Sequence, residues 1–267
     1  MSRPTHVITP VRPQDVAEIG QLSSDAFMND RQTQMKMLGK RPYDMKEITL
    51  SSLPGMLGNP RCVAVKITDE ETGKIMGFCN WGFRGFQPEE IATFGGEPPR
   101  QPPTNETEAG TESQDKDKGK AYDGPRSSDS EAEPEDDPIS RLQALTGGDL
   151  EKWMEHIMPQ GTRCIFVIGL AVSPAYQGRG VGSALLRWGT SICDKEQVFA
   201  WVHSSEMEWP MYEKSGFRVA RVLDVDLDEY APAPPPNKGP GSQWGHYMFR
   251  YMTYVPGRYQ ARTRSGE

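Results

Sequence analysis

CIFVIGLAVSPAYQGRGVGSALLRWGTSIC, residues 164–193, joins an apolar run, a glycine-rich loop and a segment with helical periodicity. The first nine residues are almost all apolar, which is typical of a strand buried in the centre of a sheet. Apolar residues then recur every three or four positions, which predicts a helix directly after the loop. These helix-spaced residues are Val181, Ala184, Leu185, Trp188 and Ile192.

The loop carries three glycines in five positions, Gly178, Gly180 and Gly182. The first N–H groups of a helix have no acceptor inside the helix, and the helix dipole adds partial positive charge there. Removing side chains lets phosphate oxygens reach these donors, and Arg179 adds a positive charge at the rim. The pattern therefore predicts a site for a phosphate-containing ligand.

Three such ligands were compared. A nucleotide-binding P-loop needs a lysine after its last glycine, but Ser183 and Ala184 follow Gly182 here. Gly178, Gly180 and Ser183 partly imitate a dinucleotide fingerprint, yet the further strand–helix units of that fold do not follow. The third ligand, the pyrophosphate of coenzyme A, meets neither objection.

The rest of the chain predicts a mixed α/β sheet with helices on both faces. A hairpin is expected at 62–83, because two apolar runs flank a polar turn that contains glycine. Strands are also expected at 5–11, 198–202, 218–225 and 246–255, and helices at 12–30, within 31–57, at 139–158 and at 209–215. We expect a single domain over residues 1–267.

Residues 87–138 form an acidic segment rich in proline, glycine and serine, with 15 acidic and five basic residues. Such a composition buries too little apolar surface to offset its ordering entropy, so we expect a disordered insertion within the domain. The remaining chain has 25 basic and 22 acidic residues, which suits an anionic ligand but not nucleic acid. A protein partner for the insertion stays an open alternative to a passive loop.

Four scattered cysteines, Cys62, Cys79, Cys164 and Cys193, lack metal-ligand spacing and are expected to be reduced thiols. No metal is expected, because that ligand spacing is absent. No membrane association is expected either, since no apolar stretch is long enough to span a bilayer. Without a signal-like N-terminus, a cytoplasmic protein is the default expectation, and a nuclear one is not excluded.

Three motifs in sequence order resemble the GNAT acetyltransferase superfamily. LAVSPAYQGRGVGSALL, residues 170–186, is similar to its acyl-CoA motif, with Gln177, Gly180 and Gly182 at the three defining positions. MYEKSGF, residues 211–217, resembles the later motif with a tyrosine, a basic residue and Gly-Phe. Residues 11–27 resemble the family's first strand–helix unit.

The resemblance implies a GNAT-like α+β fold, a twisted and mostly antiparallel sheet whose two central strands splay apart. It implies acetyl-CoA as co-substrate, with its pantetheine arm along the first of these strands and its pyrophosphate in the loop. The implied cofactor-binding residues are Leu170, Ala171, Val172, Gln177, Gly178, Arg179, Gly180, Val181, Gly182, Ser183 and Ser205. Ser205 stands where relatives often have asparagine, so its contact is a departure from the family's pattern.

For the chemistry, Tyr212 matches the tyrosine that the family places beside the coenzyme A sulfur, where a phenol can protonate the departing thiolate. Many relatives carry a carboxylate on the strand before the loop, but residues 164–172 have none. His203 is the candidate base, and water is the alternative. Glu206 and Glu208 are expected to lie in solvent. The aromatic candidates for an acceptor pocket are Trp81, Phe83, Phe86, Trp209 and Trp244.

We therefore expect an acetyl-CoA-dependent N-acetyltransferase that acts on a primary amine, with a small-molecule acceptor favoured, by direct transfer in a ternary complex. Amino acids, specialised metabolites and protein lysines stay open as acceptors. The alternatives are a noncatalytic acyl-CoA-binding or scaffold protein, an O-acetyltransferase and, more distantly, a dehydrogenase. The missing strand carboxylate is the main support for a noncatalytic protein.

Overall fold

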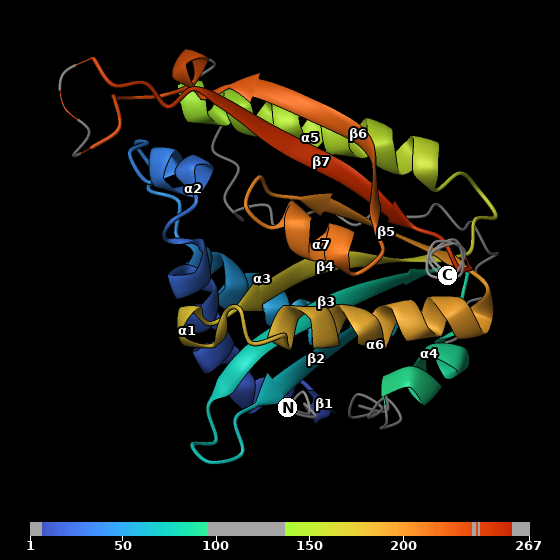
Figure 1. Ribbon diagram of the computed structural model, residues 1–267. Helices are drawn as coiled ribbons and strands as arrows, with labels where there is room; N and C mark the ends of the chain where they lie inside the picture. The colour runs from blue at the N-terminus through green and yellow to red at the C-terminus, as the bar shows by residue number, and fades with distance from the viewer. Residues whose placement is uncertain (1–6, 96–136, 237–238, 240, 258–267) are drawn as a thin grey trace, which may run out of the picture.

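The computed structural model describes residues 7–95, 137–236, 239 and 241–257 (Figure 1). The strands are β1 (Ile8–Pro10), β2 (Cys62–Thr68), β3 (Ile75–Arg84), β4 (Cys164–Val172), β5 (Phe199–Ser204), β6 (Arg218–Asp226) and β7 (His246–Tyr254). The α-helices are α1 (Val16–Phe27), α2 (Arg31–Lys36), α3 (Met45–Leu57), α4 (Pro88–Gly95), α5 (Pro138–Ile157), α6 (Val181–Glu196) and α7 (Trp209–Lys214). Short 3₁₀ turns lie at η1 (Pro13–Asp15), η2 (Pro174–Tyr176) and η3 (Leu227–Glu229).

The described strands form one sheet in the order β1-β2-β3-β4-β5-β7-β6. All neighbours pair antiparallel except β4 and β5, which are parallel. The prediction of a mixed, mostly antiparallel α/β sheet is thus confirmed. The position of β7 between β5 and β6 is a long-range pairing, and no local pattern in the sequence indicates it.

The predicted insertion begins too early. Residues 88–95 form α4, where Ile91 is buried and Phe94 packs against the main core. At the other end, the Asp137 side chain accepts a hydrogen bond from the Ser140 N–H and caps α5. The greater part of the predicted insertion, residues 96–136, lies outside the described residues.

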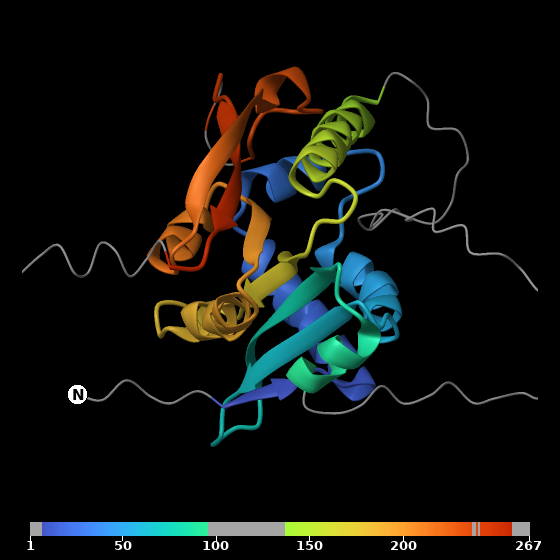
Figure 2. The same cartoon turned by 90° about the vertical axis from the view of Figure 1, so that its right-hand side faces the viewer.

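Helices cover both faces of the sheet, as the sequence predicts. The first face is packed by α6, α4 and α7 through a cluster that includes Leu185, Ile91 and Tyr212. α1 and α3 cover the other face of β2, β3 and β4, while α5 packs beside them against β4, β5 and β7. Figure 2 shows α6 and α7 on one side of the sheet and α3 and α5 on the opposite side.

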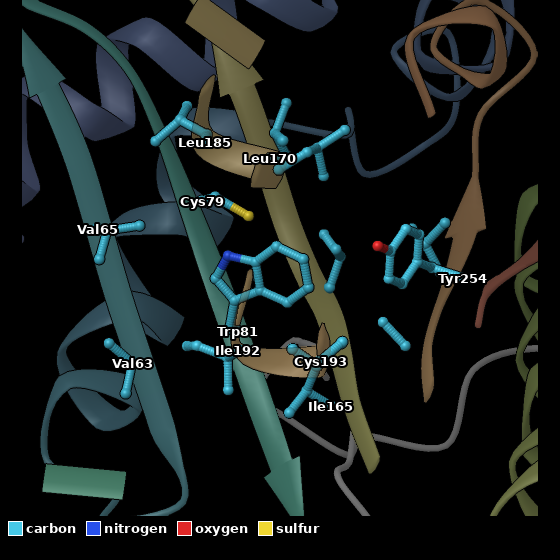
Figure 3. Close-up of a cluster of buried hydrophobic side chains, with 14 of the residues drawn as sticks. Val63, Val65, Cys79, Trp81, Ile165, Leu170, Leu185, Ile192, Cys193 and Tyr254 are labelled. Atoms are coloured by element: carbon cyan, nitrogen blue, oxygen red, sulfur yellow. The ribbon is translucent and has the colours of Figure 1, made fainter. Parts of the chain in front are cut away.

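Trp81 is the centre of the main core and is fully buried (Figure 3). Its indole lies against α6 at Gly189, where a Cβ atom would come within 2.3 Å of the ring. Gly189 is therefore required by the close approach of α6 to β3. The predicted apolar stripe of α6 faces the same cluster, with Val181, Leu185 and Ile192 buried.

We expect Gly189→Ala to lower the free energy of unfolding by about 1–3 kcal/mol, because the added methyl group overpacks Trp81. Gly147→Ala is the matched control, since Gly147 is an exposed residue in α5 and a Cβ there meets no atom within 4 Å. It should raise stability by up to about 1 kcal/mol through helix propensity alone. Urea unfolding gives the free energy of unfolding of both variants. A change of the same sign in both would contradict this role of Gly189.

Candidate functional site

The sheet opens between its two central strands. β4 and β5 pair only at Cys164–Phe166 with Phe199–Trp201. Immediately beyond, the register between β3 and β4 shifts so that Ile168 has no partner on β3, which marks a β-bulge. A bulge bends its strand, so β4 diverges from β5 from this point onward.

A cavity of about 270 Å³ lies at this opening. Its wall is built from β4 and β5, from β3 beside them, from α1 and α3 on one face, and from the start of α7. It is lined mostly by apolar side chains, with a few polar groups. Such a pocket is typical of small-molecule sites.

Beyond Phe166, the edge of β4 that faces β5 has no strand partner in the described part of the chain. The Ser173 N–H donates to the Met76 carbonyl at 2.9 Å. In this part of the chain, the odd-numbered residues of β4 are therefore the ones that hydrogen-bond to β3. By the alternation of an antiparallel ladder, the N–H and C=O groups of Leu170 and Val172 point away from β3, toward the opening. Leu170 and Ala171 also line the cavity. The strand thus offers the backbone groups of Leu170 and the N–H group of Val172, which β3 does not use, where the predicted pantetheine arm would lie.

The glycine loop follows at the end of β4. The Gln177 side chain donates to the Val172 carbonyl at 3.1 Å and ties the loop to the strand. Gly178 and Gly180 have φ angles of 74° and 87°, which side-chain-bearing residues rarely adopt, and Gly180 caps α6. The first backbone bond of α6 runs from the Ala184 N–H to the Gly180 carbonyl, so the N–H groups of the preceding turn have no acceptor within the helix.

Gly182 has a packing role in addition to the one predicted. It is buried in the first turn of α6, where a Cβ would lie 2.2 Å from the Met211 sulfur of α7. Its missing side chain therefore allows α7 to approach α6. Val181 is also buried in the core, so this residue can reach a ligand only through its backbone. Ser183 is half-buried on the same turn, and Arg179 lies 5.4 Å from the Tyr176 ring.

Tyr212 lines the cavity from α7 and is 4% exposed. Its ring packs edge-on against Phe217 at 5.6 Å. Burial raises the pKa of Tyr212 well above its usual value, and the neighbouring Cys79 and Glu208 groups raise it further. The phenol therefore keeps its proton at neutral pH and can act as a donor.

His203 lines the same cavity from β5, stacked on Phe249 and Tyr251 at 5.1 and 4.6 Å. Burial lowers the pKa of His203 from 6.5 to about 4, although the charge of Asp149 opposes this. At pH 7 the ring is neutral and binds a proton only weakly. A base role for His203 stays a prediction, and the neutral ring is better suited to hydrogen bonding.

The lowered pKa of His203 makes folding pH-dependent. The unfolded histidine binds a proton below pH 6.5, whereas the folded one does so only near pH 4. Stability is therefore lost as pH falls through this window, by roughly 2 kcal/mol between pH 7 and pH 5. We expect His203→Phe to remove this part of the loss. Urea unfolding at pH 7 and pH 5 measures the free energy of unfolding. If the variant loses as much stability between these pH values as the wild type, this role of His203 is refuted.

The two glutamates expected in solvent have separate places in the structure. Glu206 forms an ion pair with Arg31, which also donates to the Trp244 and His246 carbonyls. Glu208 lines the cavity at the start of α7. Burial raises the pKa of Glu208 above its usual value, and the negative charge of Asp30 adds to this effect. The solvent prediction for Glu208 is wrong, because α7 turns this position inward.

Asn80 is a second cavity residue that the sequence did not single out. It is 2% exposed on β3, and its Nδ2 group contacts the Met56 sulfur. Its Oδ1 atom and the Nε2 atom of His203 are both buried without a hydrogen-bond partner in the described part of the chain. Both residues line the cavity. Buried polar atoms normally have partners, so these two atoms indicate a ligand or water position.

None of the five aromatic residues predicted for the acceptor pocket lines this cavity. Trp81, Phe83 and Phe86 belong to the core on the α6 face, and Trp244 packs in a cluster around β7. The aromatic rings that line the cavity are instead Phe27, Phe78 and Phe249, together with Tyr212. Ser205 lines the cavity, and its contact with the cofactor stays a prediction.

Within residues 7–95, 137–236, 239 and 241–257, no three His, Cys, Asp or Glu side chains gather as metal ligands would. In the same ranges, each helix is too short or too polar to cross a membrane. Burial raises the pKa of Cys164 to about 12 and that of Cys193 even higher. These thiols are therefore not nucleophiles at neutral pH.

Residues 121–217 match the family model of the acetyltransferase (GNAT) family. A stretch of 63 residues is 35% identical to an uncharacterized N-acetyltransferase of Schizosaccharomyces pombe, covering 22% of this chain and 27% of that protein. The match thus spans only about a quarter of this curated relative's length.

Solved structures of two insect enzymes share the fold. Arylalkylamine N-acetyltransferase 2 of Aedes aegypti superposes with a TM-score of 0.52 at 10% identity, covering 94% of this chain and 99% of that chain. A polyamine N-acetyltransferase of Drosophila melanogaster gives a TM-score of 0.51 at 15% identity, with 94% and 100% covered. At these identities the likeness concerns the fold alone.

Proposed function

We propose that this chain, whose residues 121–217 match the acetyltransferase (GNAT) family model, transfers an acetyl group from acetyl-CoA to a primary amine. The observation that carries the proposal is the cavity at the opening of β4 and β5. Backbone groups of Leu170 that β3 does not use border it, and the loop at Gly178–Gly180 follows at the strand's end. Tyr212 lines the same cavity. These are the parts needed to hold an acyl thioester and to protonate its leaving group.

The loop supplies the anion site for the pyrophosphate. Gly178 and Gly180 turn the backbone, and the first-turn N–H groups of α6, at Val181, Gly182 and Ser183, are the proposed donors. Backbone groups of Leu170 and Val172 would bond the pantetheine amides, with Ser205 across the opening. Gln177 acts indirectly by tethering the loop to β4.

Transfer is proposed to be direct. The amine nitrogen attacks the thioester carbon while a backbone N–H stabilises the charge that develops on the carbonyl oxygen. The carbon–sulfur bond then breaks, and the thiolate takes the phenolic proton of Tyr212. The amine loses a proton, for which His203 and water are the two acceptors expected from the sequence. Buried, protonated cysteines argue against a covalent acetyl-enzyme.

The test is release of free thiol from acetyl-CoA by the full chain with a panel of amines, with the acetylated product identified by mass. Turnover of an amine supports the proposal. Tight binding of acetyl-CoA without turnover of any amine supports a noncatalytic acyl-CoA-binding protein. Turnover of alcohols alone supports an O-acetyltransferase. The names of the amine-acetylating structural neighbours agree with an amine acceptor.

A further inference from the structure

The cavity has an uneven distribution of charge. On the side formed by α1 and α3 it is lined by Phe27, Met45, Ile48, Leu53 and Met56, with hydroxyl groups of Ser23, Thr49 and Ser52 between them. Among the described lining residues, Glu208 is the one carboxylate and none is a lysine or arginine. A ligand on this side therefore meets an apolar wall with a single negative group.

Glu208 lies in this cavity near Tyr212, the proposed proton donor. It precedes α7 and lies four positions before Tyr212, so both side chains share one face of the helical turn. Both line the cavity. Arg31 forms its ion pair with Glu206, not with Glu208, and donates to two backbone carbonyls. Glu208 thus stays available to a cationic ligand.

Asn80 adds a second acceptor to the cavity, from β3. Its Oδ1 atom is buried without a partner in the described chain, although the side chain is held in place by its contact with Met56. Such an atom gains a hydrogen bond only from a group that enters the cavity. An ammonium group has three donors and no acceptor, so it matches a site made of a carboxylate and an amide oxygen.

Building on the proposed function, we propose that the acceptor is a small monoamine with an apolar body, bound through Glu208 and Asn80, and that Glu208 removes its proton. The apolar body would occupy the side of the cavity formed by α1 and α3. A second ammonium group or a carboxylate on the substrate would be buried there without a charged partner, which is costly. Polyamines and amino acids are therefore poor acceptors.

Several titratable groups surround Glu208. Asp30 faces it from the start of α2, and Tyr212 shares its helix face. His203 lies on β5 in the same cavity, and Tyr247 of β7 donates to Asp30 at 2.7 Å. Asp30 and burial both favour the protonated form of Glu208, which gives the carboxyl a higher pKa than an exposed one. A base with such a raised pKa accepts a proton from an amine more readily.

Glu208→Gln tests the base, with Glu213→Gln as the matched control. Glu213 lies on the same helix and is exposed, so this identical change leaves the cavity intact. At pH 7, kcat of Glu208→Gln should fall about 100-fold, while that of Glu213→Gln stays near the wild-type value. The acid limb of the wild-type kcat profile should also disappear in Glu208→Gln. Binding of acetyl-CoA, followed calorimetrically, reports that the variant is folded.

The amine panel tests the substrate class on the wild-type chain. Phenethylamine and hexylamine should exceed putrescine and phenylalanine in kcat/KM by at least about tenfold, because the latter two bury a second charge. Better turnover of the diamine or the amino acid overturns the inference. So does a Glu208→Gln variant as active as Glu213→Gln with the same pH profile. In both cases N-acetylation itself stands, whereas no turnover of any amine would mean that the proposed function fails.

Discussion

Tyr212→Phe should lower kcat for amine acetylation about 100-fold at pH 7, while the Kd of acetyl-CoA stays unchanged. The phenylalanine ring keeps the packing on Phe217 and removes only the hydroxyl that lines the cavity. The departing thiolate, with a thiol pKa near about 8.5, then lacks a nearby proton. Steady-state kinetics give kcat, and calorimetric titration gives the Kd.

Tyr254→Phe is the matched control for this change. Tyr254 belongs to the same core cluster, but its hydroxyl donates to Asp194 at 2.8 Å and does not line the cavity. Losing that bond to a carboxylate should cost about 1.5–3 kcal/mol of stability and leave kcat intact. If both variants lose activity equally, Tyr212 acts through packing, and if neither does, the thiolate obtains its proton elsewhere.

Gly180→Val should raise the Kd of acetyl-CoA roughly tenfold to 100-fold. Gly180 has a φ angle of 87° at the start of α6, a conformation that is strongly unfavourable for a β-branched residue. The loop would relax away from it and turn at least one donor from the pyrophosphate. A hydrogen bond to a charged group contributes about 1.5–3 kcal/mol, which corresponds to this change in Kd.

Gly241→Val separates backbone strain from cofactor binding. Gly241 has a similar φ of 77° and free space around it, but it lies in the loop before β7. It should lose comparable stability and keep its affinity for acetyl-CoA. An unchanged Kd in a folded Gly180→Val protein would remove the loop from the proposed pyrophosphate site. Gly182 is unsuitable for this test, because a side chain there collides with Met211.

Much of the fold could be predicted because its signals are local. The apolar run at Cys164–Val172 and the helix-spaced residues from Val181 onward became β4 and α6 close to their expected limits. The hairpin of β2 and β3 also formed as expected. The acidic segment was predicted less well at its start, since a proline and two glutamates open α4, and Ile91 anchors that helix in the core.

The candidate site was harder to predict, since its residues come from distant segments. The motif around Tyr212 indicates its role, whereas the sequence predicts a solvent position for Glu208 and does not single out Asn80. Between Ile75 and Phe83, all residues of the strand other than Asn80 are apolar or glycine, and a lone polar residue in such a buried run is a signal that could have been used. The inward turn of Glu208 has no comparable local signal.

The sequence by itself determined the strand, the glycine loop and the helix that form one side of the site, because periodicity and glycine content act over a few residues. Only the tertiary structure decided where the sheet opens, which carboxylate enters the cavity and why each glycine is needed. β4 and β5 separate after Phe166 because of a bulge set by pairing with β3, a strand about 85 residues earlier in the chain. Gly180 is needed for its backbone angle, while Gly182 and Gly189 are needed because Met211 and Trp81 pack against them. Such contacts depend on which segments fold side by side, and short-range patterns in a sequence carry no information about that.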